Sequence, residues 1–361
     1  MKLIFLLCRW GQAVVLIDDN LYIHGGMTDE FNAYSYTSAP TSSDIILLPL
    51  SNTFSVSTPP YELISSSDNE TITVSQGPSL AWHAIGALDI STSLLFGGLP
   101  DANSLPPVVT LTDSSWLLKI SNTFIPEWIS QDATWAGQPM RRIHHTTVST
   151  ISGRLYIFGG ERADGSDTVF SEHYVFDPKG PSFTQLPTEN GPPGITGHAS
   201  VILSNGTILV FGGYCTSEPG LLPFSTIWAL DTSQDTLSWQ LWPVSNTSLP
   251  SPRRAFAVTV LPGDRVLIHG GSDQGYQTTF DDGWILDTSQ NPMTWTVVDA
   301  LTQLGPRRDH FAVSYGNDVI FGFGKSQIQQ ASIFAHHESQ AMVAQALQAQ
   351  NLACTILRLV K

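Results

Sequence analysis

The chain has 361 residues, of which 42% are hydrophobic and only 13% are charged, with 29 glycines and 23 prolines. This composition indicates a folded core built from many short strands and turns, and it excludes a disordered or coiled-coil chain. The net charge of −15 argues against nucleic acid or an anionic membrane surface as a partner, because both attract basic proteins.

The N-terminal segment, "MKLIFLLC", is a short apolar run with one lysine. It lacks the cleavage site of a full secretory signal. Residues 1–8 are therefore either a signal remnant or a strand, residues 2–7, that completes a sheet. No run of about 18 apolar residues occurs, so we expect no membrane span in this chain. The cysteines, Cys8, Cys215 and Cys354, are too far apart to predict a disulfide framework or a metal knuckle.

A glycine pair that follows a strand-like apolar run recurs along the chain. Successive copies lie 53 to 72 residues apart. Internal repeats of this length indicate an array of equivalent structural units. The copies read "LYIHGG" to Gly26, "LLFGG" to Gly98, "LYIFGG" to Gly160, "ILVFGG" to Gly213, "VLIHGG" to Gly271 and a degenerate "VIFGFG" to Gly324.

Each glycine pair ends a predicted hairpin. Fourteen residues before the pair, or before Gly324 in the last copy, an apolar and β-branched run begins, and a turn of Asp, Asn or Gly then favours positive φ. A variable loop, a third strand with an aromatic residue and a fourth aromatic strand follow the pair. The unit is therefore four antiparallel strands. The runs begin at His83, His145, His198, Phe256 and His310. In the first copy the run begins at Gln12, thirteen residues before Gly25.

This unit resembles the kelch repeat, and the resemblance covers roughly residues 9–324. It implies an all-β fold, a six-bladed kelch β-propeller around a central channel. It also implies that the glycine pairs belong to the scaffold. A phosphate-binding role for them is not favoured, because no Lys-Ser/Thr of a Walker loop follows any pair.

The sixth copy contains only the first hairpin. From about Glu338 to Val360, Ala, Gln and Leu predominate and Gly and Pro are absent, which favours a helix. We therefore expect a propeller domain of residues 9–334 with an incomplete last blade, followed by a helical tail of residues 335–361. Residues 2–7 are the candidate for a strand that completes this blade.

One face of the propeller is predicted to bind the partner. The loops between the second and third strands share a face with the links between blades, and long loops on a rigid scaffold favour binding. In kelch domains that bind acidic peptides, arginines at similar positions contact the ligand. The resemblance thus predicts a channel mouth that binds an anionic group through Arg9, Arg142, Arg254 and Arg308. The alternative is that these arginines pair with acids and carbonyls of neighbouring blades.

Motifs for catalysis are missing from the sequence. The recurring histidines do not predict a metal centre, because a repeated position in a propeller is spread around a wide circle. We expect them to bond backbone atoms. The copper ligands of galactose oxidase are not matched, since Tyr214 and Cys215 are adjacent in sequence. No nucleophile elbow occurs. We therefore expect no cofactor and no metal, although a fold does not fix a function.

Several phrases, including "GPPGITGHAS" and "SPRRAFAVTVL", resemble uncharacterised fungal kelch ectodomains, similar to the central domain of galactose oxidase. The resemblance implies an extracellular or cell-surface location, and Asn69, Asn205 and Asn246 lie in glycosylation sequons. We expect a non-catalytic scaffold that binds a protein, peptide or glycan. The alternatives are a secreted galactose-oxidase-like or other carbohydrate-active enzyme and a cytoplasmic adaptor.

Overall fold

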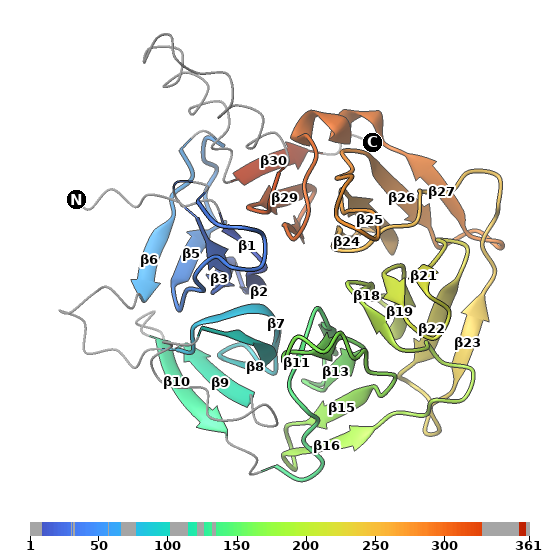
Figure 1. Cartoon of the computed structure of the whole chain (residues 1–361), viewed down its shortest axis with the longest axis horizontal. Helices are drawn as coiled ribbons and strands as arrows, with labels where there is room; N and C mark the ends of the chain where they lie inside the picture. The colour runs from blue at the N-terminus through green and yellow to red at the C-terminus, as the bar shows by residue number, and fades with distance from the viewer. Residues whose placement is uncertain are drawn as a thin grey trace.

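The computed structural model describes residues 9–29, 31, 33–56, 58–65, 77–101, 115–120, 126–131, 135–326 and 354–358. Nearly all regular structure in these ranges is β-strand, apart from the 3-10 helix η1 (Asp299–Leu304). No helix in the described ranges is long and apolar enough to cross a membrane. Five four-stranded antiparallel sheets and the three-stranded sheet β28-β29-β30 follow one another around a central axis (Figure 1). The predicted all-β kelch propeller is confirmed, and we call these sheets blades 1 to 6.

Blades 1 to 5 each pair four strands in chain order, so each blade is a simple meander. Blade 1 contains β2 (Ala13–Ile17), β3 (Asn20–His24), β5 (Ile45–Pro49) and β6 (Glu62–Ser65). Blade 2 contains β7 (Leu80–Ala87), β8 (Thr92–Pro100), β9 (Ser115–Ile120) and β10 (Pro126–Gln131). Blade 3 contains β12 (Thr146–Ser149), β13 (Leu155–Phe158), β15 (Tyr174–Asp177) and β16 (Ser182–Gln185).

The remaining blades complete the circle. Blade 4 contains β18 (Ala199–Ile202), β19 (Thr207–Phe211), β22 (Ile227–Asp231) and β23 (Trp239–Trp242). Blade 5 contains β24 (Ala257–Leu261), β25 (Arg265–His269), β26 (Gly283–Asp287) and β27 (Thr294–Val297). Blade 6 contains β28 (Phe311–Tyr315), β29 (Asp318–Gly322) and β30 (Cys354–Arg358).

The tail corrects one expectation from the sequence. Within the predicted helix, Cys354–Arg358 form the strand β30, which pairs antiparallel with β29. An open sheet edge offers a row of unpaired backbone groups, and pairing with it outweighs the helix propensity of the surrounding composition. The other residues of the predicted tail, and residues 2–7 as a closing strand, lie outside the described residues.

A ring of backbone hydrogen bonds joins the blades around the channel. One residue in each blade donates its N–H to the carbonyl of the equivalent residue in the preceding blade, at 2.7–3.4 Å. In blade 1 this residue is Gly11, two positions before β2. The last bond runs from Gly11 in blade 1 to Asp309 in blade 6 and closes the circle. All members have φ of 51–66°. We call them the channel ring: Gly11, Trp82, His144, Gly197, Ala255 and Asp309.

The glycine pairs form the second contact between blades. The N–H of the second glycine donates to a carbonyl in the segment that leads into the next blade, as from Gly271 to Arg307 at 2.8 Å and from Gly324 to Arg9 at 2.7 Å. The first glycine leaves room for that segment. A Cβ on Gly270 would lie 2.3 Å from the Arg307 carbonyl oxygen and 2.9 Å from His310 Cε1. The pairs therefore occupy scaffold positions.

We predict that Gly270→Ala costs about 2–5 kcal/mol of unfolding free energy, because the methyl group meets backbone atoms of the next blade and φ is +66°. The matched control is Gly263→Ala, in the turn between β24 and β25. Its φ is +80°, but nothing lies within 4 Å of the added Cβ, so only the strain of about 1–2 kcal/mol is expected. Urea denaturation measures both. Equal losses would contradict the proposed role of the glycine pair.

Candidate binding site at the channel mouth

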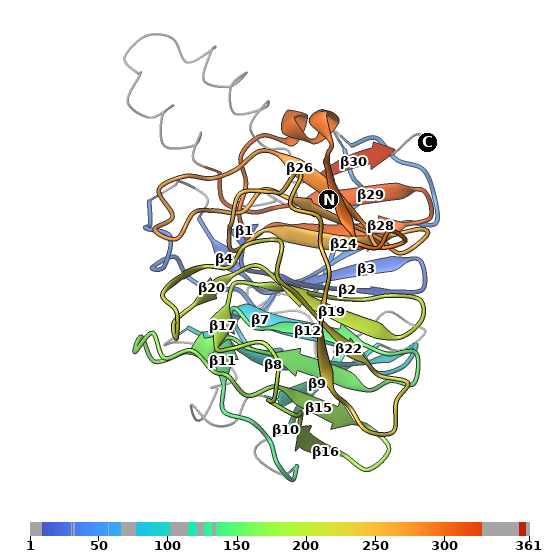
Figure 2. The ribbon, with the colours of Figure 1, turned by 90° about the vertical axis from the view of Figure 1, so that its right-hand side faces the viewer.

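Short strand pairs define one face of the propeller. In each, the segment leading into the innermost strand pairs with the start of the loop after the second strand. The pairs gather on one side of the molecule (Figure 2), which we call the mouth face. They are β1 (Arg9–Trp10) with β4 (Met27–Thr28), β11 (Arg142–Ile143) with β14 (Glu161–Arg162), and β17 (Ile195–Thr196) with β20 (Tyr214–Cys215) and then β21 (Gly220–Leu221).

The four arginines predicted from the sequence occupy two different positions on this face. Arg9 and Arg142 occupy the first position, which Arg253 fills in blade 5. Each donates to the carbonyl of the first glycine of its own blade's pair, at 2.9 Å for Arg142 and 3.0 Å for Arg253. All three side chains are buried. Arg9 also pairs with Asp44 at 2.7 Å. These arginines are thus bound to carbonyls and an acid, but within their own blades and not in neighbouring blades as the alternative expected.

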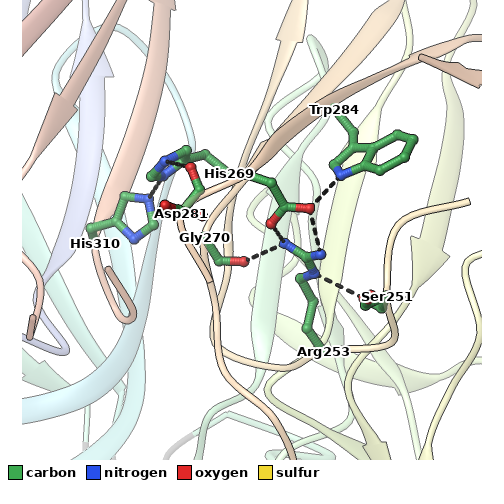
Figure 3. Close-up of polar contacts among 8 residues, drawn as sticks. Ser251, Arg253, His269, Gly270, Asp281, Trp284 and His310 are labelled. Carbon is green, nitrogen blue, oxygen red and sulfur yellow. Dashed lines mark hydrogen bonds and ion pairs between the residues drawn. The ribbon is translucent and has the colours of Figure 1, made fainter. Parts of the chain in front are cut away.

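Arg253 shows how this first position ties the loops to the blade (Figure 3). Its guanidinium donates to both carboxylate oxygens of Asp282, at 2.5 and 2.9 Å, and to the Gly270 carbonyl. Asp282 in turn accepts a hydrogen bond from the Trp284 indole at 2.6 Å. The charge of Arg253 is therefore satisfied within its own blade and is not offered to a ligand.

Arg254 and Arg308 occupy the second position and lie at the channel mouth. The Arg254 guanidinium lies 3.9 Å from the ring centre of Tyr276, and its Nη2 donates to the Gln274 carbonyl at 2.7 Å. No carboxylate lies within ion-pair distance of Arg254 in the described part of the chain. Arg308 is buried between the rings of Tyr36 and Tyr276, at 4.5 and 4.9 Å. Successive residues of an extended segment point to opposite sides, which explains the division.

A cavity of about 520 Å³ opens at the mouth beside Arg254. Its walls come from the loops of blades 1, 3, 4 and 5 and from the channel ring. They combine four aromatic rings with two carboxylates, Glu161 and the exposed Asp167, and two guanidinium groups, Arg162 and Arg254. The side chains on which the argument depends are Tyr36, Trp82, Glu161, Tyr214, Arg254 and Tyr276.

Tyr36 reaches the centre of the mouth from the loop between β4 and β5. Its ring lies 5.5 Å from that of Trp82 and 5.0 Å from that of Tyr276. Its hydroxyl donates to the Asp309 carboxylate of the channel ring. Burial raises the pKa of Asp309 to about 6. Tyr36 therefore connects blades 1, 2, 5 and 6 across the mouth.

Glu161 is the half-buried carboxylate of the cavity. Its side chain is 17% exposed, and its ion-pair contact in the described structure is His144 Nε2 at 3.8 Å. Burial, together with the smaller effect of the Arg254 charge, lowers the pKa of His144 to about 3, so the imidazole is neutral at pH 7. Burial also raises the pKa of Glu161. Glu161 thus has no charged partner in direct contact.

A second cavity of about 220 Å³ adjoins the first and lies within the channel. The recurring histidines line it. His83, His198 and His310 bond side chains rather than the expected backbone atoms, and His145 has no hydrogen-bond partner among the described residues. His83 and His310 meet the histidines that end the second strands of the preceding blades, His24 and His269, both at 2.9 Å. The described residues contain no group of three or more side chains placed to hold a metal ion.

Two sequon asparagines have described positions. Asn205 is exposed in the turn between β18 and β19, and Asn246 is exposed after β23. The Asn205 side chain accepts a hydrogen bond from the N–H of Thr207 at 2.9 Å. Asn69 lies outside the described residues. Both described sites are open to an enzyme from solvent.

Sequence reasoning missed the aromatic walls of the cavity. Tyr36 and Tyr276 lie in irregular loops, where no periodicity marks a residue that points inward. Glu161 is one of many acidic residues in these loops, and nothing in the sequence distinguishes it from the others. Their common feature in the sequence is their place shortly after a glycine pair, which this fold brings to the mouth.

Comparison with known proteins supports the repeat assignment. Residues 82–324 match the KLHDC2/KLHL20/DRC7 Kelch-repeats domain. This chain belongs to the kelch-repeat family. The matched range includes the segments leading into blades 3 to 6, and hence most of the mouth. The finer resemblance to fungal ectodomains and to galactose oxidase is not part of this match and stays a prediction.

Individual relatives share the kelch region with this chain. Adagio-like protein 1 of Oryza sativa subsp. japonica is 27% identical over 262 residues, which cover 70% of this chain and 39% of that protein. The flagellar outer arm dynein alpha chain of Chlamydomonas reinhardtii is 29% identical over 184 residues, 49% of this chain and 4% of that protein. An F-box/kelch-repeat protein of Arabidopsis thaliana is 27% identical over 219 residues, which cover 58% of this chain and 42% of that protein. The chain spans less than half of each relative.

We predict a steep loss of stability between pH 6.5 and about 4. Burial lowers the pKa of all eight described histidines, to about 3 for His24 and His198 and about 4 for His173 and His269. The unfolded chain binds more protons in this window, so unfolding free energy falls as pH falls, by up to about 1.4 kcal/mol per pH unit for each histidine. Asp309 and Glu161, whose pKa values burial raises, oppose this effect.

Thermal denaturation in buffers from pH 7.5 to 4 measures the effect. The midpoint is expected to stay level above pH 7 and to decrease below pH 6.5. An unchanged midpoint between pH 7.5 and 5 would show that the histidines are not held neutral by the packing between blades.

Proposed function

We propose that this chain is a non-catalytic protein-binding propeller that receives a peptide segment of its partner at the mouth face. The observation that carries the proposal is the cavity of about 520 Å³ with aromatic walls and Arg254. A rigid scaffold with a few polar groups placed among aromatic rings suits recognition of a side chain or a turn. Membership of the kelch-repeat family is consistent with a protein-interaction role.

Arg254 supplies the anchor for the ligand. Its neighbour Arg253 is paired with Asp282 in the same blade, whereas Arg254 has no carboxylate in contact, and its buried Nε has no hydrogen-bond partner in the described structure. A guanidinium that lies over the Tyr276 ring keeps its charge and its remaining donors available. We infer that it binds a carboxylate of the partner peptide, as the sequence predicted for this arginine.

Selection from a displayed library of random peptides tests the proposal. Arg254→Gln is expected to reduce affinity for the selected peptides by at least about tenfold, because it removes the charge from the cavity. The matched control, Arg265→Gln, removes an exposed arginine at the start of β25 and should leave affinity unchanged.

Two results would count against the proposal. Peptides whose binding is unaffected by Arg254→Gln, or is reduced equally by both variants, would contradict the mouth as the binding site. A library that yields no binder, together with binding of oligosaccharides on a glycan array, would replace a protein ligand by a glycan.

We also propose an extracellular or cell-surface location, supported by the sequons and by the exposure of Asn205 and Asn246. Expression of the native gene in a eukaryotic host is expected to give a glycosidase-sensitive mass shift, which Asn205→Gln and Asn246→Gln each reduce. Absence of any shift, with the protein recovered from the cytosol, would overturn this proposal and favour an intracellular partner.

A further inference from the structure

We propose that the mouth cavity selects a segment with paired opposite charges, in which an anionic group contacts Arg254 and a cationic group contacts Glu161. The inference rests on the proposed function, because it specifies the chemistry of the same peptide ligand. It adds a second anchor in the same cavity, to which no part of the sequence pattern pointed.

The local strand geometry places Glu161 in the cavity. Glu161 pairs with Ile143 across β11 and β14, while the next residue, Arg162, pairs with Arg142. Arg162 then forms an ion pair with Asp164 at 2.8 Å on its own loop. Arg162 is therefore occupied and does not neutralise Glu161. Burial of the Arg142 guanidinium against the ring of Phe170, at 4.3 Å, leaves that arginine occupied as well.

Glu161 and Arg254 lie near enough to influence each other's charge without forming an ion pair. The Arg254 charge acts on the Glu161 carboxylate, but no contact within 4.0 Å joins them. Both also act on the Tyr276 hydroxyl, whose pKa burial raises to about 12. The two groups therefore lie in the same cavity with Tyr276 in reach of both and with space between them.

The cost of burying charge decides which ligand fits. A peptide that covers the cavity removes water from both groups, and burying a charge without a partner is strongly unfavourable. A purely anionic segment would satisfy Arg254 and leave Glu161 desolvated and unpaired. A purely cationic segment would do the reverse. A segment that carries both charges satisfies the two groups together, so these charges exclude ligands that carry only one.

The experiment compares the sequence preferences of three forms of the chain against one displayed peptide library. Wild type is expected to enrich peptides that contain both an acidic and a basic residue a fixed distance apart. Glu161→Gln should abolish the enrichment of the basic residue and retain that of the acidic one. Arg254→Gln should do the opposite. Glu218→Gln, an exposed acid on a mouth-face loop outside the cavity, is the control and should behave as wild type.

Affinities of a synthetic peptide from the wild-type selection, and of versions with Lys or Arg replaced by Gln, complete the test. Glu161→Gln and the peptide substitution should each lower affinity about tenfold, and combining them should add little more, since they remove the same contact. Thermal denaturation confirms that each variant is folded.

Two failures are distinguishable. If binding depends on Arg254, but the basic residue is not enriched or its enrichment survives Glu161→Gln, the paired-charge inference is wrong and the proposed function stands. If no selected peptide depends on either residue, both are wrong.

Discussion

The contact between the glycine pair of one blade and the lead segment of the next is the constraint on which the rest of this propeller depends. A carbonyl of that segment approaches the first glycine so closely that no Cβ fits, as at Gly270 and Gly159, where the oxygen would lie 2.3 Å away. The second glycine donates a backbone hydrogen bond to the same segment. The channel ring repeats this junction nearer the axis, and its last bond joins the first blade to the sixth. Positive φ at both sites, which most residues avoid, is sustained by closure of the circle.

The same junction determines the chemistry of the mouth. The lead segment lies extended beside its own glycine pair, so one side chain points into the blade and the next points toward the channel. An arginine at the first position neutralises loop carbonyls and acids, as Arg253 does with Asp282. A residue at the second position points to the other side of the segment, toward the channel. Arg254 and Ile143 line the mouth cavity from this position, whereas Trp10 and Arg308 are buried there. Most arginine charge on this face therefore holds loops in place.

The sequence predicted the repeating unit well and the site less well, for a physical reason. Glycine pairs, turns and aromatic strands recur because every blade packs against its neighbours in the same way. A pattern that is weak in one copy therefore predicts the fold specifically when it occurs six times. The site depends on differences between blades. A shift of one residue separates Arg253 from Arg254, and no periodic pattern resolves it. Tyr36 enters the mouth from an irregular loop, and β30 forms because the edge of β29 is available to it. Such features follow from tertiary contacts rather than from local propensity.

The central claim is that the mouth cavity, lined by Arg254 and Glu161, binds a segment of the partner. The most direct measurement is a crystal structure of the chain bound to a selected peptide. The account predicts a peptide carboxylate on the Arg254 guanidinium and a peptide cation on Glu161, with the peptide packed against Tyr276. Peptide seated on the opposite face, around the hairpin turns, or on the rim without entering the cavity would contradict it.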